Sequence, residues 1–332
     1  QTTHQSASPS TNGYHNGRNG KEERIAVPSD PAALAALLRQ QMVWKLIPGT
    51  TVGRALVSAT DRLRGAKIAT DSLDAQIMLA SVLGVDRSWL FAHHDYELTE
   101  IQAATYSSLV VRRTQDEPIA YLIGKKEFYG LELAVDQRVL IPRPETELLV
   151  DQVLRFIQLY GERTVRIADI GTGSGAIALA LSTNTTDSLI YAVDISAEAL
   201  ALAEENVARH DQNGQIRLLC GDLLQPLYEQ VDIIVDNLPY INHRDYVSLD
   251  RSVREFEPQV ALEAGDDGLD ASRGLLQDAP RYLSPNGIIF LEIAYDQGQA
   301  VLDLVQELVP QASDVELRQD LSGHDRFVTV II

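Results

Sequence analysis

The second half of the chain alternates between short apolar runs and longer segments of helical periodicity. The apolar runs are rich in β-branched and aliphatic residues, as buried strands are, and the first begins at Val165. Their sequences are VRIADI, SLIYAVDI, QIRLLC, VDIIVDN, GIIFLEIA, DVELRQD and RFVTVII. Buried strands that alternate with helices predict an α/β fold with a mostly parallel sheet and helices on both faces. The last two runs have no helix between them, which predicts an antiparallel pair at one edge.

The first part of the chain has a different pattern. Residues 1–28 are polar and lack the apolar core of a signal peptide, so we expect a disordered tail. Residues 29–117 show helical spacing in SDPAALAALLRQQMVWKL, DSLDAQIMLASVLGV and TEIQAATYSSLVVRRTQDEP, which predicts a small helical domain. In residues 118–144, Tyr121–Ile123 and Leu131–Val135 flank a glycine-containing segment. We expect a β-hairpin there, linking the helical domain to a second domain at 145–332.

Charge and cysteine content restrict the partners and the compartment. The net charge of −19 argues against a broad nucleic-acid or membrane-surface footprint, because phosphate binding depends on clustered Lys and Arg. Cys220 is the single cysteine, so neither a disulfide framework nor a cysteine-based metal site is expected. No apolar run reaches the length of a membrane span. We therefore expect a cytoplasmic protein without direct nucleic-acid or membrane binding, and a monomer as the default state.

A glycine-rich turn follows the first strand, in IADIGTGSGAIALAL. Gly171, Gly173 and Gly175 can take positive φ and let the backbone approach a ligand, and the following helix presents free N–H groups. Together with Thr172, these residues are candidates for cofactor binding. The turn alone does not identify the cofactor, because Gly171, Gly173 and Ala176 also satisfy the dinucleotide pattern G-x-G-x-x-G/A.

Acidic residues at successive strand ends favour S-adenosylmethionine over NAD. Asp169, just before the glycine turn, suits the cationic part of S-adenosylmethionine and would repel a pyrophosphate. Asp194 ends the second strand, where a carboxylate can accept two hydrogen bonds from a ribose diol. Asp222 follows the third strand and is a candidate partner for the adenine amino group. Ligands of open α/β sheets bind at the carboxyl ends of strands, so the adjoining Ile195 and Leu223 belong to the predicted site. Each acid could instead cap the turn or helix that follows it.

The fourth strand runs directly into Asn237-Leu238-Pro239-Tyr240. A planar NH₂ group on a substrate can donate one hydrogen to the side-chain oxygen of Asn237 and the other to the backbone carbonyl of Leu238. These bonds would orient the nitrogen toward a methyl group and concentrate its lone pair, while Tyr240 covers the planar group. The sequence thus predicts a catalytic seat for a planar amine or amide, and it requires no metal.

The chain resembles the protein-(glutamine-N5) methyltransferases that act on peptide chain release factors, the PrmC/HemK family. The resemblance extends from about Ala32 to the carboxyl end and rests on the stretches PIAYLIGKKEFYGLELAVDQRVLIPRPETELLV, IADIGTGSGAIALAL, YAVDIS, CGDLL, DNLPYI, EPQVALEAGDDGLDASRGLL, LEIAYDQG and DLSGHDR. It implies a Rossmann-like class I methyltransferase fold with a seven-stranded sheet, and S-adenosylmethionine as the cofactor. It also implies methyl transfer to the glutamine of a Gly-Gly-Gln motif in a class I release factor, which the helical domain helps to dock.

The resemblance extends to individual residues. It implies that Asn237 and the Leu238 carbonyl hold the glutamine amide, and that Gly171, Asp194 and Asp222 serve the cofactor. It further implies that the loop Pro142-Arg143-Pro144 closes over the site. In this loop, Arg143 and the following Glu145 would either hold the substrate backbone or keep the loop ordered. The chain departs at Leu238, because the family pattern is Asn-Pro-Pro-Tyr. A leucine still supplies the carbonyl and the following proline restricts its backbone, so we expect retained activity and a somewhat looser loop.

Two other functions fit parts of this pattern. A nucleic-acid methyltransferase that acts on exocyclic amines, such as adenine N6, would use the same seat, because these groups are also planar NH₂ groups. It would need a flipped or single-stranded base, and the acidic composition argues against it. A binding module that keeps the fold without the chemistry is suggested only by Leu238.

Overall fold

The computed structural model describes residues 44–161, 163–211, 213–320 and 322–332. Internal contacts divide the chain into two units, residues 1–44 and residues 45–332, and all the described helices and strands belong to the second unit. The predicted disordered tail and nearly all of the first predicted helix lie outside the described residues. The domain boundaries expected from the sequence remain predictions.

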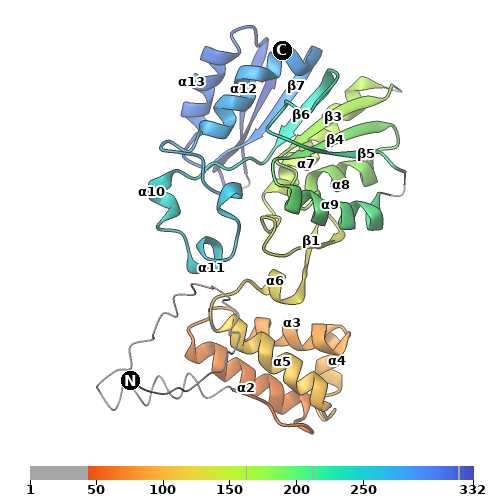
Figure 1. Cartoon of the computed structure of the whole chain (residues 1–332), viewed down its shortest axis with the longest axis vertical. Coiled ribbons are helices and arrows are strands. Elements are labelled where there is room, and N and C mark those ends of the chain that lie inside the picture. Colours follow the sequence, from red (N-terminus) through yellow and green to blue (C-terminus); the bar gives the residue numbers. More distant parts are fainter. Residues whose placement is uncertain (1–43, 162, 212, 321) are drawn as a thin grey trace, which may run out of the picture. The chain divides into compact units, whose positions relative to one another are not determined.

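Residues 52–123 are mostly helical, in agreement with their apolar spacing (Figure 1). Thr99 forms a capping box with Gln102 ahead of one helix, and Gly84 ends another in the left-handed conformation with φ 66°. The helices are α2 (Val52–Gly65), α3 (Asp71–Leu83), α4 (Arg87–Ala92), α5 (Glu100–Arg113) and α6 (Ile119–Ile123).

The predicted hairpin is present, but one of the two segments expected on either side of its glycine-containing segment is not a strand. Tyr121–Ile123 lies in α6 and not in a strand. The short apolar run follows Pro118 at the N-cap, and Gly124 ends the helix with φ 71°. The hairpin consists of β1 (Lys125–Phe128) and β2 (Leu131–Ala134). Its two-residue turn has positive φ at both positions, 51° at Tyr129 and 76° at Gly130, as tight hairpin turns require.

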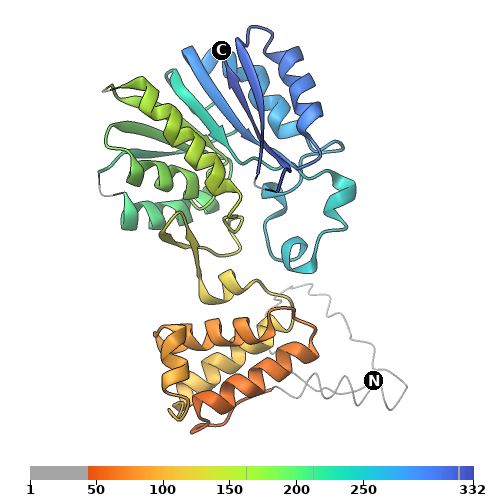
Figure 2. The ribbon, with the colours of Figure 1, turned by 180° about the vertical axis from the view of Figure 1, so that it is seen from behind.

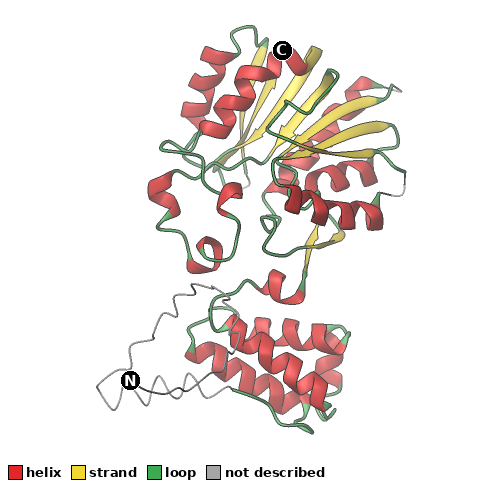
Figure 3. Cartoon of the chain, in the orientation of Figure 1, coloured by secondary structure: helices red, strands yellow, loops and turns green. Residues whose placement is uncertain are grey.

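The remaining strands form one seven-stranded sheet of order β5-β4-β3-β6-β7-β9-β8 (Figure 3). They are β3 (Val165–Ile170), β4 (Ser188–Asp194), β5 (Ile216–Cys220), β6 (Val231–Asp236), β7 (Leu283–Glu292), β8 (Asp314–Gln319) and β9 (Asp325–Ile331). The first five in this order are parallel neighbours, whereas β9 is antiparallel to both β7 and β8. The predicted mostly parallel sheet with an antiparallel final pair is confirmed.

Helices cover both faces of the sheet (Figure 1, Figure 2). One face carries α7 (Thr146–Ile157), α8 (Ala176–Asn184) and α9 (Ala197–His210), and the short 3₁₀ helix η1 (Gln158–Tyr160) directly follows α7 in the chain. The other carries α12 (Asp270–Tyr282) and α13 (Gly298–Leu308). Strand residues alternate between these two cores: in β3, Ile167 packs with α7 and α8, whereas Ala168 and Ile170 pack with α12 and α13. This alternation decides which way each side chain at a strand end points.

The connection from β6 to α12 is long and mostly irregular. It contains the short helices α10 (His243–Tyr246) and α11 (Arg251–Arg254) and the 3₁₀ helix η2 (Gln259–Ala261). Its far end, residues 258–265, returns to the carboxyl edge of the sheet and lines the cavity there. Among the described residues, no helix is both long and apolar enough to cross a membrane.

Candidate active site

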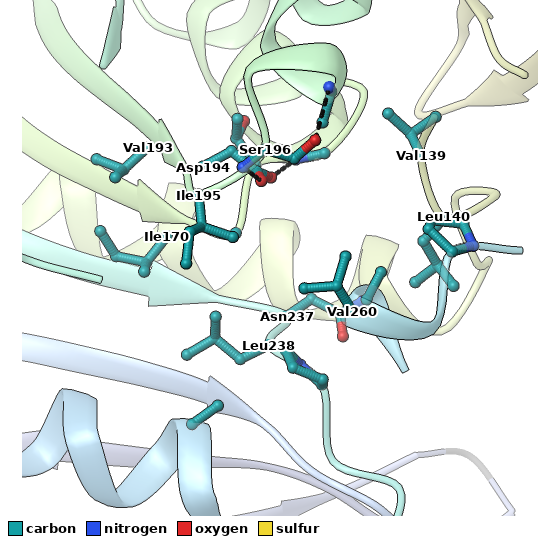
Figure 4. Close-up of a pocket in the computed structure, with 18 of the residues that line it drawn as sticks. Val139, Leu140, Ile170, Val193, Asp194, Ile195, Ser196, Asn237, Leu238 and Val260 are labelled. Atoms are coloured by element: carbon teal, nitrogen blue, oxygen red, sulfur yellow. Dashed lines mark hydrogen bonds between the residues drawn. The ribbon is translucent and has the colours of Figure 1, made fainter. Parts of the chain in front are cut away.

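A cavity of about 550 Å³ opens at the carboxyl ends of β3, β4 and β6 (Figure 4). Its walls include the glycine turn after β3, residues 193–196, residues 221–223 and residues 237–239. Figure 4 shows Ile170 and Val193 on one side, and Val139 and Leu140 on the opposite side. The size is typical of small-molecule sites, which measure about 300–1,000 Å³.

The glycine turn forms one wall of this cavity. Gly171, Gly173 and Gly175 have φ values of 73°, 56° and 80°, a region that L side chains rarely adopt. Gly171, Thr172 and Gly173 line the cavity, whereas Gly175 is the N-cap of α8 and does not. The buried side chain of Asn206 donates to the Ser174 carbonyl at 2.9 Å, which fastens the turn to α9.

Two of the three predicted acids line the cavity. Asp194 accepts hydrogen bonds from the backbone N–H of Gly173 at 2.8 Å and of Ser196 at 2.9 Å. Burial raises the pKa of Asp194, although these backbone bonds oppose the change. Asp222 also lines the cavity, as do the predicted neighbours Ile195 and Leu223. The structure therefore brings the ends of β4 and β5 together with the glycine turn.

Asp169 is not among the lining residues. Its side chain is fully buried, and its Oδ2 accepts hydrogen bonds from Thr172 Oγ1 at 2.6 Å and from the backbone N–H of Ala178 at 3.1 Å. Alternation along β3 directs it to the face of α7 and α8, beneath the turn. Its Oδ1 has no hydrogen-bond partner within the described part of the chain. A role toward the cationic part of a cofactor remains a prediction.

The buried position of Asp169 gives a testable pH dependence of stability. Burial raises the pKa of Asp169 to about 7, and the bonds from Thr172 and Ala178 oppose the shift. A carboxyl group with a raised pKa in the folded state stabilises that state fully below its unfolded pKa, and loses this contribution as the pH rises through about 7. We expect the thermal midpoint of Asp169→Asn, relative to the wild type without ligand, to increase from pH 5 to pH 8. If the difference between the two thermal midpoints is constant from pH 5 to pH 8, the raised pKa of Asp169 is contradicted.

The end of β6 forms a second wall. Asn237, Leu238 and Pro239 line the cavity, and Asn237 Nδ2 donates to Thr146 Oγ1 at 3.0 Å. Tyr240 is not among the lining residues. Its backbone carbonyl accepts a hydrogen bond from Gln297 Nε2 at 3.0 Å, and burial raises the pKa of its phenol to about 12.

Leu238 contributes more than the backbone carbonyl expected of it. Its side chain is 7% exposed and packs with the core on the α12 and α13 face. A β-carbon on Gly171 would lie only 3.0 Å from Leu238 Cδ2, so this leucine packs directly on the glycine turn. Its N–H also donates to Asp236 Oδ1 at 3.5 Å. The expectation that the leucine changes only the stiffness of the loop is therefore incomplete, because a proline would provide neither the N–H nor the same packing.

The predicted substrate loop is only partly at the cavity. Pro142 lines it, whereas Pro144 and Glu145 are exposed and do not. Arg143 Nη2 donates to the buried carboxylate of Glu257 at 2.5 Å. The same carboxylate accepts from the backbone N–H of Ile141 at 3.0 Å. These contacts order the loop, which is one of the two roles that the sequence left open for Arg143.

Sequence reasoning missed several residues that hold the site together. They are Thr146, Asn206, Glu257, Glu292 and Gln297, and all have buried side chains. Most of them lie inside the stretches that carry the family resemblance, such as LEIAYDQG and EPQVALEAGDDGLDASRGLL. The polar residue type inside such a stretch was the available signal, and the structure adds that these side chains are buried, where polar groups are normally hydrogen-bonded.

The residues present fit S-adenosylmethionine. Glycines with positive φ make room for a ligand close to the backbone, and Asp194 offers carboxylate oxygens at the strand end that faces the cavity. The cavity lining also includes the apolar residues Leu223, Val260 and Ala264, and apolar walls suit a planar base. Within the described ranges, no group of three or more His, Cys, Asp or Glu residues could hold a metal ion.

Comparisons with known proteins agree with this arrangement. Family models match residues 54–124, as a PrmC N-terminal domain, and residues 145–254, as a methyltransferase small domain. A release factor glutamine methyltransferase from Nitratidesulfovibrio vulgaris is 37% identical over 84% of this chain and 94% of its own length. Proteins of the same name from Caulobacter vibrioides and Xylella fastidiosa are 39% and 41% identical, over 84% and 83% of this chain and 95% of each relative.

These relatives confirm the resemblance stated from the sequence motifs, and the seven-stranded sheet confirms the fold that it implied. They do not favour a nucleic-acid methyltransferase. The similarity covers both the helical segment and the cavity-bearing sheet. This chain belongs to the family of release factor glutamine methyltransferases.

Proposed function

We propose that this protein transfers a methyl group from S-adenosylmethionine to the side-chain amide nitrogen, N5, of the glutamine in the Gly-Gly-Gln motif of a peptide chain release factor. The observation that carries the proposal is the position of Asn237 and Leu238 in the same cavity as the glycine turn and Asp194. The names of the relatives support the choice of glutamine and of release factors.

The seat at Asn237 orients the substrate amide. The glutamine NH₂ donates one hydrogen to Asn237 Oδ1 and the other to the Leu238 carbonyl, and these two acceptors turn the nitrogen lone pair toward the methyl group. Both bonds strengthen as positive charge develops on the nitrogen, so they stabilise the transition state more than the bound substrate. When bound, S-adenosylmethionine supplies an electrophilic methyl group on a sulfonium sulfur.

Asp236, the carboxylate next to Asn237 in the sequence, is not placed to accept the proton that the methylated nitrogen releases. Asp236 is fully buried, and alternation directs its side chain to the opposite face, where it accepts from the Leu238 N–H. Burial also raises the pKa of Asp236 well above its ordinary value. In the proposed mechanism water accepts this proton, since an amide that carries an extra proton on nitrogen is strongly acidic.

A methyl-transfer assay tests the proposal directly. Purified release factor, DNA and RNA are each incubated with the protein and methyl-labelled S-adenosylmethionine, and the modified residue is mapped by mass spectrometry. We expect label only in the release factor, at the Gly-Gly-Gln glutamine. A release factor with Gln→Glu at that position serves as the control and should remain unlabelled. Label confined to nucleic acid, or on another residue, would overturn the proposal.

The helical segment is the proposed docking region for the release factor, and residues 145–332 are the proposed methyltransferase domain. The match of residues 54–124 to a PrmC N-terminal domain supports this division. The cytoplasmic location and the monomeric state remain predictions from the sequence.

A further inference from the structure

Thr146 links the candidate active site to a buried acid. It is the first residue of α7, and its side chain is 3% exposed. Its Oγ1 accepts a hydrogen bond from Asn237 Nδ2 at 3.0 Å. The Thr146 side chain also lowers the pKa of the Glu292 carboxylate, as a hydrogen-bond donor does, and Glu292 ends β7 and is 6% exposed. Three polar groups from separate elements thus form a chain that leads from the protein interior to the cavity.

The number of available protons fixes the direction of these bonds. A hydroxyl has one proton and two lone pairs, and an ionised carboxylate can only accept. The Thr146 proton therefore goes to Glu292, and a lone pair of Oγ1 remains for Asn237. This selects one of the two orientations of the Asn237 amide, with its NH₂ toward Thr146. The reverse orientation would place Asn237 Oδ1 against an oxygen lone pair with no proton between them.

We propose that Thr146 and Glu292 are positioning residues that hold the Asn237 amide with Oδ1 toward the substrate nitrogen. The inference rests on the proposed function, in which Asn237 Oδ1 accepts from a glutamine NH₂. In a flipped amide, the NH₂ of Asn237 would face the NH₂ of the substrate, donor against donor. The arrangement also selects against glutamate, because a carboxylate would meet the Asn237 oxygen and the Leu238 carbonyl without a proton to share.

Charged and titratable groups from several elements interact electrostatically with Glu292. They are Glu145 beside α7, Arg143 in the loop before it, Arg326 on β9, Asp236 on β6 and Tyr240 after β6. Burial raises the pKa of Glu292 to about 7, and the bond from Thr146 opposes the shift. A protonated Glu292 no longer requires the Thr146 proton, so the selection of one Asn237 orientation is lost. The rate that depends on this orientation is therefore present above that pKa and declines as the pH falls through it.

The first test compares Thr146→Val with Thr146→Ser. Valine keeps the shape of threonine without the hydroxyl, whereas serine keeps the hydroxyl. We expect Thr146→Val to lower kcat about tenfold, the effect of losing one orienting hydrogen bond, and Thr146→Ser to stay within about threefold of the wild type. Cofactor affinity, measured by calorimetry, should remain within about twofold for both variants. Equal kcat values for the two variants, or a loss of cofactor affinity that parallels kcat, would overturn the proposal.

The second test uses the pH profile of kcat with Glu292→Gln. An amide has almost the same shape as the carboxylate but does not titrate, and it can donate as well as accept. We expect the wild-type kcat to decline below the pKa of Glu292, which is about 7. Glu292→Gln should have a lower kcat at pH 8 and should lack this decline. A variant profile that declines in parallel with the wild type would contradict the role of Glu292.

Different results would contradict the proposed function and the positioning role of Thr146. If the wild-type protein does not methylate glutamine at all, the proposed function is wrong. If the wild type is active and Thr146→Val is equally active and folded, as judged by its thermal midpoint, only the positioning role is wrong.

Discussion

Asn237→Ala is expected to lower kcat about 100- to 1,000-fold while leaving cofactor affinity nearly unchanged. The magnitude is that of removing one group that stabilises charge in a transition state. Alanine removes the Oδ1 acceptor, so the glutamine nitrogen keeps only the Leu238 carbonyl and loses its orientation toward the methyl group. The glycine turn, Asp194 and Asp222, which form the proposed cofactor site, are not altered by this change.

The measurement is single-turnover methyl transfer, with cofactor binding followed by calorimetry. Asn184→Ala is the matched control, since Asn184 lies at the end of α8, does not line the cavity, and its amide donates to the Ala180 carbonyl at 2.8 Å. We expect the control to retain wild-type kcat. A comparable loss of cofactor affinity and kcat in Asn237→Ala would place the residue in the cofactor site and remove it from the substrate seat.

Gly268→Ala is expected to have the second largest effect, although residue 268 does not line the cavity. Gly268 has φ 75°, and a β-carbon there would lie 2.4 Å from the Tyr240 carbonyl oxygen and 2.8 Å from Gln297 Nε2. Gln297 Nε2 donates to both the Tyr240 and the Gly268 carbonyls, at 3.0 and 3.2 Å, so this contact cannot survive unchanged. The segment after Asn237 must shift, and we expect kcat to fall at least about tenfold with a loss of stability of about 1–3 kcal/mol.

A glycine elsewhere separates backbone strain from the loss of this contact. Gly84 has φ 66°, and a β-carbon on it would meet nothing within 4 Å. Gly84→Ala should therefore cost stability through its backbone conformation alone and keep its activity. Thermal unfolding and kcat, measured on Gly268→Ala and Gly84→Ala, separate the effect of backbone strain from the loss of the Gln297 contact. If Gly268→Ala loses stability but keeps wild-type kcat, the position of Tyr240 is not set through residue 268.

The central sheet was predictable because its signals are local. The runs around Ile167 and Ile233 are apolar over the length of a strand, and helices with glycine or serine at their ends separate them, so each element could be identified from its own residues. The position of Asn237 at the cavity was predictable for the same reason, since it directly follows a strand at the edge where ligands bind. The run Tyr121–Ile123 was misassigned because three apolar residues fit a short helix and a strand equally well.

The contacts that complete the site were not predictable, because they join distant parts of the chain. Asn237 and Thr146 are 91 residues apart, and Arg143 and Glu257 are 114 residues apart. No local pattern pairs such residues, and only the packing of α7 and the long connection onto the sheet edge brings them together. The inward position of Asp169 also depends on which face of β3 carries α8, a feature of the tertiary fold.

The leucine at position 238 has a consequence for inhibitor design. Leu238 lines the cavity with its Cδ2 atom close to Gly171, and the family motif has a proline at position 238. A leucine side chain is larger than proline and branched, whereas a proline ring is bonded back to its own backbone nitrogen. A cofactor analogue with a bulky group directed at residue 238 would thus meet walls of different shape in this protein and in relatives with proline. Such a compound would discriminate between them by shape alone.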